Sequence, residues 1–176
     1  QTRNVPISIG YKGIKRMTDY LQERNAGFVY SDYLEIKESQ TKKHPVIDYQ
    51  IGSVRDDFDF GSLIMVKSNL IAECVEKMDD NYDYPYSSLY YLRLYASRVS
   101  DIIHINEYLY TEHELDNRAS GEKQFDYVNP RNREVQIDME RVFTDYLSDI
   151  DAKLYPFYQE VDFIDGEFPV EASVII

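Results

Sequence analysis

Short apolar runs typical of buried strands alternate with segments of helical periodicity along most of this chain. Residues 28–30, 62–66 and 102–105 are rich in β-branched, aromatic and other apolar side chains, and each run is too short for a buried helix. Between and beyond them, apolar side chains recur every three or four residues, as in amphipathic helices. Strands that alternate with helices favour a sheet layered with helices, so we expect an α/β fold.

The helical segments have recognisable limits. We expect helices over residues 12–24, from residue 68 onward, over about 87–99 and over about 131–150. Ser68 or Asn69 is suited to be an N-cap, and Pro130 suits a helix start because its missing N–H has no intrahelical partner to lose there. Residues 42–45 are expected to be an exposed connection, and residues 108–110 a further short strand.

The chain carries a large negative charge. Its 176 residues include 32 acidic and 19 basic side chains, a formal net charge of −13. Phosphate neutralisation requires an excess of Lys and Arg, which argues against a nucleic-acid partner and against docking on an anionic membrane. No apolar stretch reaches the roughly 18 residues of a transmembrane segment. The single cysteine, Cys74, excludes an internal disulfide and fits a reducing compartment, so we expect a cytoplasmic protein.

Asp32 follows the first apolar run, in the sequence VYSDYLE. A buried strand that ends at Asp32 would place its carboxylate at the edge of the sheet where open α/β sheets bind ligands. Carboxylate oxygens suit hard cations such as Mg²⁺, which often bridge to the phosphates of a nucleotide. A turn or capping aspartate would give the same pattern, so a structural role stays open.

Three aspartates occur within four positions of the sequence RDDFDFG, residues 55–61. In an extended segment Asp57 and Asp59 would share one face while Phe58 and Phe60 point inward. The two carboxylates are therefore candidate catalytic groups. A charged rim beside a strand anchored by phenylalanines is the structural alternative.

A long polar stretch, residues 113–133, precedes the last helical segment. Loops longer than about 12 residues in a compact domain are usually functional or disordered, and the Phe-Asp-Tyr-Val centre of this one favours order. The apolar stripe of the following helix is expected to be buried against the sheet, which would bring the loop over the strand ends near Asp32. Five polar side chains are then best placed to bind substrate: Asp116, Arg118, Asp126, Asn129 and Arg131.

Several other chemistries lack their motifs. The sequence contains no P-loop, no dinucleotide-binding glycine motif and no G-x-S-x-G elbow. Its three histidines, His44, His104 and His113, have no metal-ligand spacing among themselves. His104 lies between isoleucines and is interpreted as a core or rim histidine rather than a catalyst.

The order of these features resembles the C-terminal half of a GT-A fold, as in family 2 glycosyltransferases. The matching sequences are the strand before Asp32, then FDFGSLIMV, YYLRLYASR and IIHINEYLY, over roughly residues 12–115. The resemblance implies a partial GT-A-like mixed sheet with flanking helices. In that family an aspartate motif holds the metal and the nucleotide-sugar diphosphate, and a histidine near the end of the fold often completes the metal site. An acidic pair before a later helix supplies the general base.

The chain departs from the family at several of these positions. The first metal-motif aspartate falls on Tyr30, so the resemblance leaves Asp32 as metal ligand, with His113 near the family histidine but displaced. The acidic pair falls on Tyr86 and Ser87, and a serine cannot act as a carboxylate base. The tryptophan of the family's acceptor motif is absent, because the chain has no Trp. These departures indicate a weakened or degenerate site.

The chain stops on the apolar run ASVII, which resembles the opening strand of the same family. We therefore expect residues 1–168 to form the partial GT-A-like domain. Residues 169–176 would be a linker and the start of the first strand of a following glycosyltransferase domain, and residues 174–176 would be poorly buried by their own domain.

Two functions stay open. In the first, the chain is a segment of a glycosyltransferase that uses a nucleotide-diphospho-sugar and a glycan acceptor. Asp32 and His113 would hold Mg²⁺ or Mn²⁺ on the diphosphate, with Asp57 or Asp59 near the acceptor. In the second, the chain is a non-catalytic GT-A-like module that binds glycan or positions the adjacent transferase domain of the same chain. Ser87 favours the second for this segment alone, and a carboxylate from residues 112–133 would restore the first.

Overall fold

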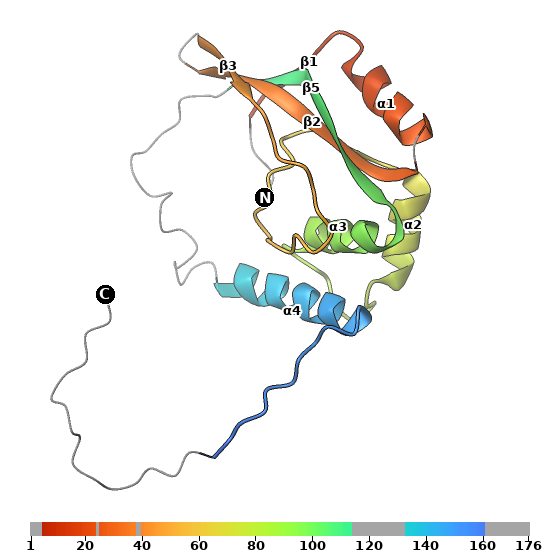
Figure 1. The fold of residues 1–176 in the computed structure, drawn as a ribbon, viewed down its shortest axis with the longest axis vertical. Coiled ribbons are helices and arrows are strands. Elements are labelled where there is room, and N and C mark those ends of the chain that lie inside the picture. Colours follow the sequence, from red (N-terminus) through yellow and green to blue (C-terminus); the bar gives the residue numbers. More distant parts are fainter. Residues whose placement is uncertain (1–4, 24, 38–39, 114–132, 161–176) are drawn as a thin grey trace, which may run out of the picture.

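A mixed five-stranded sheet with helices on both faces forms the centre of the molecule (Figure 1). The structure is a computed structural model that describes residues 5–23, 25–37, 40–113 and 133–160. The strands are β1 (Ile7–Ile9), β2 (Ala26–Lys37), β3 (Gln40–His44), β4 (Ile64–Val66) and β5 (Asp101–His113). The helices are α1 (Gly13–Glu23), α2 (Ser68–Lys77), α3 (Ser88–Val99) and α4 (Arg133–Asp149). The expected α/β class, a mixed sheet with flanking helices, is confirmed.

The long strands β2 and β5 lie side by side and form the spine of the sheet. They are parallel and pair along most of their length, from Ala26 opposite Asp101 to Ile36 opposite His113. β1 is antiparallel to β5, while β4 pairs antiparallel with the first half of β2 and β3 with its second half. Parallel neighbours need a crossover connection, and the chain between β2 and β5 supplies it with α2 and α3.

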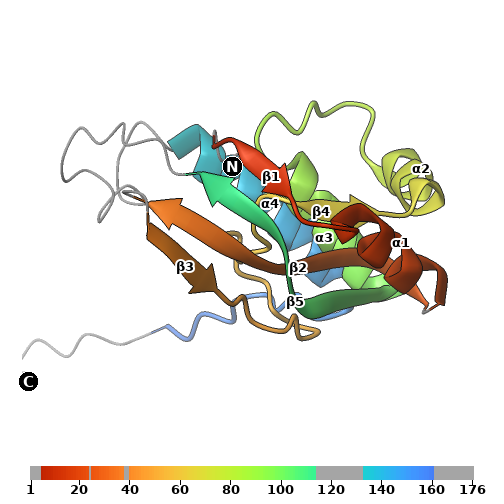
Figure 2. The same cartoon turned by 90° about the horizontal axis from the view of Figure 1, so that it is seen from above.

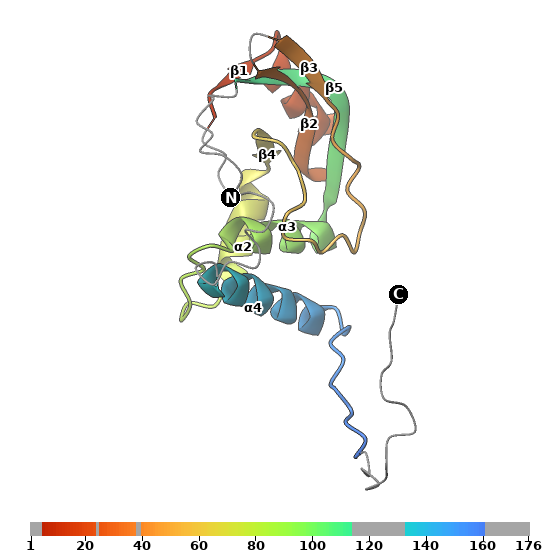
Figure 3. The ribbon, with the colours of Figure 1, turned by 90° about the vertical axis from the view of Figure 1, so that its left-hand side faces the viewer.

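The two faces of the sheet have separate cores because successive side chains of a strand point to opposite sides. Val29 contacts the α1 core, with Met17 and Leu21, whereas Phe28 and Tyr30 belong to the core beneath α2 and α3. Figures 2 and 3 show α1 on one side of the sheet and α2 with α3 on the other. No helix in the described part of the chain is long and apolar enough to cross a lipid bilayer.

α4 packs on α3, and the expectation that its stripe is buried against the sheet is wrong. Val142 and Tyr146 of α4 form a third core with Tyr90 and Leu94 of α3. Figure 3 shows α4 on the side of α3 that is remote from the sheet. The physical reason is that α3 carries apolar side chains on two faces, one for the sheet and one for α4.

Three local expectations are corrected. Asp32 does not end its strand, because β2 continues to Lys37, where its second half pairs with β3. Residues 42–44 are part of β3 and not a connection, although their side chains are largely exposed. The N-cap of α2 is Lys67, without a side-chain capping bond, rather than Ser68 or Asn69.

Candidate functional site

Asp32 is a buried carboxylate in the middle of β2. Its register with β5 shifts on both sides of it, between Ser31 and Asp32 and between Asp32 and Tyr33, and such bulges often re-aim side chains beside functional sites. Only 1% of Asp32 is exposed. Its Oδ1 accepts the backbone N–H of Val46 at 2.9 Å and lies 2.8 Å from Nε2 of His104. Among the described residues, its Oδ2 has no hydrogen-bond partner.

His104 connects this buried carboxylate to the surface. Its Nδ1 lies 2.7 Å from Oδ1 of Asp48, whose side chain is 84% exposed, while the histidine side chain itself is 6% exposed. The imidazole stacks on the ring of Tyr30, with centroids 5.1 Å apart. Both ring nitrogens face carboxylate oxygens, and the doubly protonated imidazolium is the form that donates to both. We call Asp32, His104 and Asp48 the carboxylate–imidazole array.

Residues 46–48 form a cover over Asp32. The Val46 N–H is bonded to Asp32, the Ile47 carbonyl accepts the Tyr30 hydroxyl at 2.7 Å, and Asp48 is held by His104. Val46 is itself buried. A ligand therefore reaches the free Oδ2 of Asp32 only if residues 46–48 are displaced.

His113 does not join Asp32. It pairs with Ile36 in the β2–β5 register, and Ile36 is about 13 Å along the strand from Asp32 at the usual rise per residue. Its Nε2 lies 2.8 Å from the Ser8 hydroxyl on β1. Within the described ranges, no three His, Cys, Asp or Glu side chains are grouped so that they hold a metal ion. Asp32 and His113 thus do not form a metal site as a pair.

Asp57 and Asp59 have different partners. Phe58 and Phe60 between and beyond them pack against the core, as expected. Asp57 is exposed and accepts two hydrogen bonds from Arg55, at 2.8 and 2.7 Å, which lower the pKa of its carboxyl and make it a weaker base. Asp59 accepts the N–H of Gly61 and lies 3.4 Å from His44. The structure does not bring the two carboxylates to one common partner.

The five predicted substrate-binding residues lie outside the described residues. They are Asp116, Arg118, Asp126, Asn129 and Arg131. The expectation for residues 169–176 also falls on residues that the structure does not describe.

Asp138 of α4 is a buried carboxylate that the sequence interpretation missed. It is 1% exposed and accepts the Tyr82 hydroxyl at 2.7 Å and the Tyr86 N–H at 2.8 Å. Tyr86 directly precedes the N-cap of α3, so the carboxylate lies at the positive end of that helix. The available signal was its spacing, because Asp138 lies four residues before Val142 and shares the buried face of α4.

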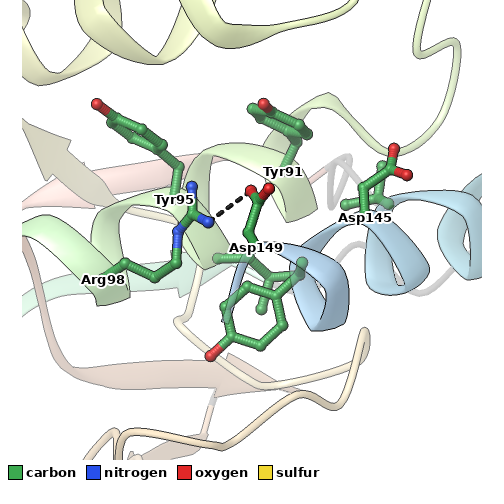
Figure 4. Close-up of a pocket in the computed structure, with 8 residues that line it drawn as sticks. Tyr91, Tyr95, Arg98, Asp145 and Asp149 are labelled. Atoms are coloured by element: carbon green, nitrogen blue, oxygen red, sulfur yellow. Dashed lines mark hydrogen bonds and ion pairs between the residues drawn. The ribbon is translucent and has the colours of Figure 1, made fainter. Parts of the chain in front are cut away.

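Two depressions lie between α3 and α4. The one in Figure 4 has a volume of about 10 Å³, room for about one water, and Arg98 and Asp149 form an ion pair at its side. The second has a volume of about 340 Å³ and lies along the first half of α4. Its lining residues are Val54, Arg55, Asp56, Tyr90, Gln136, Met139, Glu140 and Phe143.

The functional residues therefore fall into two places: the carboxylate–imidazole array on the sheet, and the groove between α3 and α4. The chain matches no protein-family model and no curated protein, so its function has to be inferred from this geometry.

Proposed function

We propose that the chain is a segment of a nucleotide-sugar-dependent glycosyltransferase of the GT-A type, with a weakened metal and diphosphate site at Asp32. The observation that carries this proposal is the position of Asp32. It lies at a bulge in a parallel strand pair, buried, with one carboxylate oxygen that has no partner among the described residues. Mg²⁺ commonly uses one or two protein carboxylates together with substrate phosphates and waters, so a single aspartate oxygen is compatible with a weak site.

The second candidate function is a non-catalytic GT-A-like module that binds glycan or positions an adjacent transferase domain of the same chain. The cover over Asp32 favours it, since Val46 and His104 already occupy Oδ1 and His113 lies elsewhere on the sheet. The serine at position 87 favours it as well, because a hydroxyl does not replace a carboxylate base.

Calorimetric titration with uridine or guanosine diphosphate and Mn²⁺ separates the two. The first proposal predicts weak, metal-dependent binding that is lost in Asp32→Asn and retained in the control Asp145→Asn, an exposed carboxylate on α4. Absence of binding by the wild-type chain would favour the non-catalytic module. Nanomolar affinity would contradict the weakened site.

A further inference from the structure

The groove along the first half of α4 has the dimensions of a small-molecule site. Its volume of about 340 Å³ falls within the usual range for ligand pockets, about 300–1,000 Å³. One wall is the turn of residues 54–56, Tyr90 of α3 lies between the walls, and the other wall is one face of α4. That face is formed by residues at i, i+3, i+4 and i+7, namely Gln136, Met139, Glu140 and Phe143.

The lining combines buried apolar groups with exposed polar ones. Tyr90 is buried, and Val54, Met139 and Phe143 are half-buried, so together they make an apolar floor. The polar lining residues are exposed on both walls: Arg55 and Asp56 on one, Gln136 and Glu140 on the other. An apolar floor with a few polar groups at its edges is the usual composition of a site that fixes the orientation of a small ligand.

The charges of the groove exclude an anionic ligand. Two carboxylates, Asp56 and Glu140, face one guanidinium, Arg55, and that guanidinium is already bonded twice to Asp57. Phosphate and carboxylate ligands are bound by cations in excess, which this groove does not offer. A neutral ligand fits the groove better than a nucleotide does.

The polar groups match the hydroxyls of a sugar. Carboxylates accept hydrogen bonds, a guanidinium donates them, and the amide of Gln136 does both, whereas each sugar hydroxyl is both donor and acceptor. The C–H face of a pyranose ring is apolar and would lie on the floor at Met139 and Phe143.

The walls of the groove are held in place without a ligand. The Tyr90 hydroxyl donates to the Val54 carbonyl at 2.5 Å and so fixes the turn of residues 54–56 to α3. The Arg93 guanidinium lies 4.7 Å from the centroid of the Tyr90 ring. Asp138 bonds α4 to the chain before α3. A ligand would therefore bind a largely pre-formed surface, which reduces the ordering cost of association.

From these observations we propose that the groove binds a neutral oligosaccharide, separately from the Asp32 site. This inference rests on the proposed function, in which the chain handles a glycan, and it locates the glycan on α3, α4 and residues 54–56.

The test is a titration of the full chain with maltotriose, cellotriose and chitotriose at millimolar concentration, followed by backbone amide NMR shifts. At least one saccharide is expected to shift amides of residues 54–56 and 136–143 saturably. The double variant Gln136→Ala/Glu140→Ala is expected to weaken binding about tenfold or more, since two hydrogen bonds are lost. The control Glu134→Ala/Asp145→Ala, on the opposite side of α4, should leave the affinity within about twofold.

The inference is overturned if none of the saccharides shifts the groove amides, if the control variant weakens binding as much, or if a tetralysine peptide or uridine diphosphate shifts them instead. Failure here is distinct from failure of the proposed function. Diphosphate with Mn²⁺ is read through Asp32→Asn, and the groove variants leave that binding unchanged. Saccharide binding without diphosphate binding would retain the groove and reduce the function to the glycan-binding module.

Discussion

The imidazole Nε2 of His104 lies 2.8 Å from Oδ1 of the buried Asp32 and so joins the two parallel strands through their side chains. The other ring nitrogen of His104 reaches Asp48 at 2.7 Å. Asp32 is closed by the same cover, because Val46 also binds its Oδ1. The histidine therefore links the stability of the sheet to access to the one carboxylate on which the metal proposal depends.

Removal of the imidazole is expected to cost far more stability than neutralisation of Asp48. His104→Ala leaves the buried Asp32 with the Val46 N–H alone, and the loss of a hydrogen bond to a charged buried group is worth about 2–3 kcal/mol. Asp48→Asn changes a side chain that is 84% exposed, so its effect should stay below about 1 kcal/mol. Urea denaturation measures both, and equal losses would show that Asp32 does not depend on His104.

A methyl group at Gly61 is expected to disturb the segment that carries Asp59. Gly61 has a φ of +70°, and a Cβ there would lie 1.9 Å from the Tyr110 hydroxyl, which accepts the Ser62 N–H at 2.7 Å. Gly61→Ala should therefore lose more than about 2 kcal/mol from strain and clash together.

Gly52 offers the matched control for this substitution. Its φ is +91°, yet a Cβ at that position would meet no atom within 4 Å. Gly52→Ala should show only the backbone cost of about 1–2 kcal/mol. If denaturant titration gives the same loss for both variants, the clash with Tyr110 is not significant.

The helices were predictable because each carries its own amphipathic period, and α2, α3 and α4 begin within a few residues of the expected positions. β3 was not predictable in the same way. Its sequence Gln-Thr-Lys-Lys-His has no apolar alternation, and the strand exists because its backbone pairs with β2. That pairing also extends β2 beyond Asp32, which explains why the expected strand end was wrong.

The candidate site was predictable in part. Asp32 stood out after an apolar run, but its partner His104 lies 72 positions away and meets it only through the parallel register in which Tyr30 pairs with His104. A histidine between isoleucines signals burial, and a buried histidine requires hydrogen-bond partners. What the local sequence lacks is the identity of those partners, since tertiary pairing decides it.

Asp138 is expected to make the packing of α4 on α3 sensitive to acid. Burial raises the pKa of its carboxyl, but hydrogen bonds from Tyr82 and Tyr86 outweigh it and bring the pKa below the ordinary value of 3.8. A depressed carboxyl pKa adds stability above the unfolded value, and this stability is lost as the pH falls through the native value. At neutral pH Asp138→Asn should lose about 1–3 kcal/mol, because its amide cannot accept both bonds.

The pH dependence of that difference checks the cause. Stability measured by urea denaturation near neutral pH and at a pH of about 3 should show the gap between wild type and Asp138→Asn narrowing at the lower pH. Asp145→Asn, an exposed change on the same helix, should show a small difference at both. A gap that stays constant would mean that Asp138 acts through packing rather than through its charge.

The guanidinium of Arg93 is expected to be replaceable by an apolar side chain of similar length. Arg93 is 3% exposed, its Nε and Nη2 atoms have no hydrogen-bond partner among the described residues, and burial lowers its pKa. Its favourable contacts are the rings of Tyr90, at 4.7 Å, and Phe60, at 5.8 Å. Because desolvation of a poorly paired charge offsets such contacts, Arg93→Met should stay within about 1 kcal/mol of wild type or exceed it in stability. Arg93→Ala leaves a cavity beneath Tyr90 and should lose about 2–4 kcal/mol. Denaturant titration of the two variants separates packing from charge, and a Met variant as unstable as the Ala variant would show that the guanidinium itself stabilises the floor of the groove.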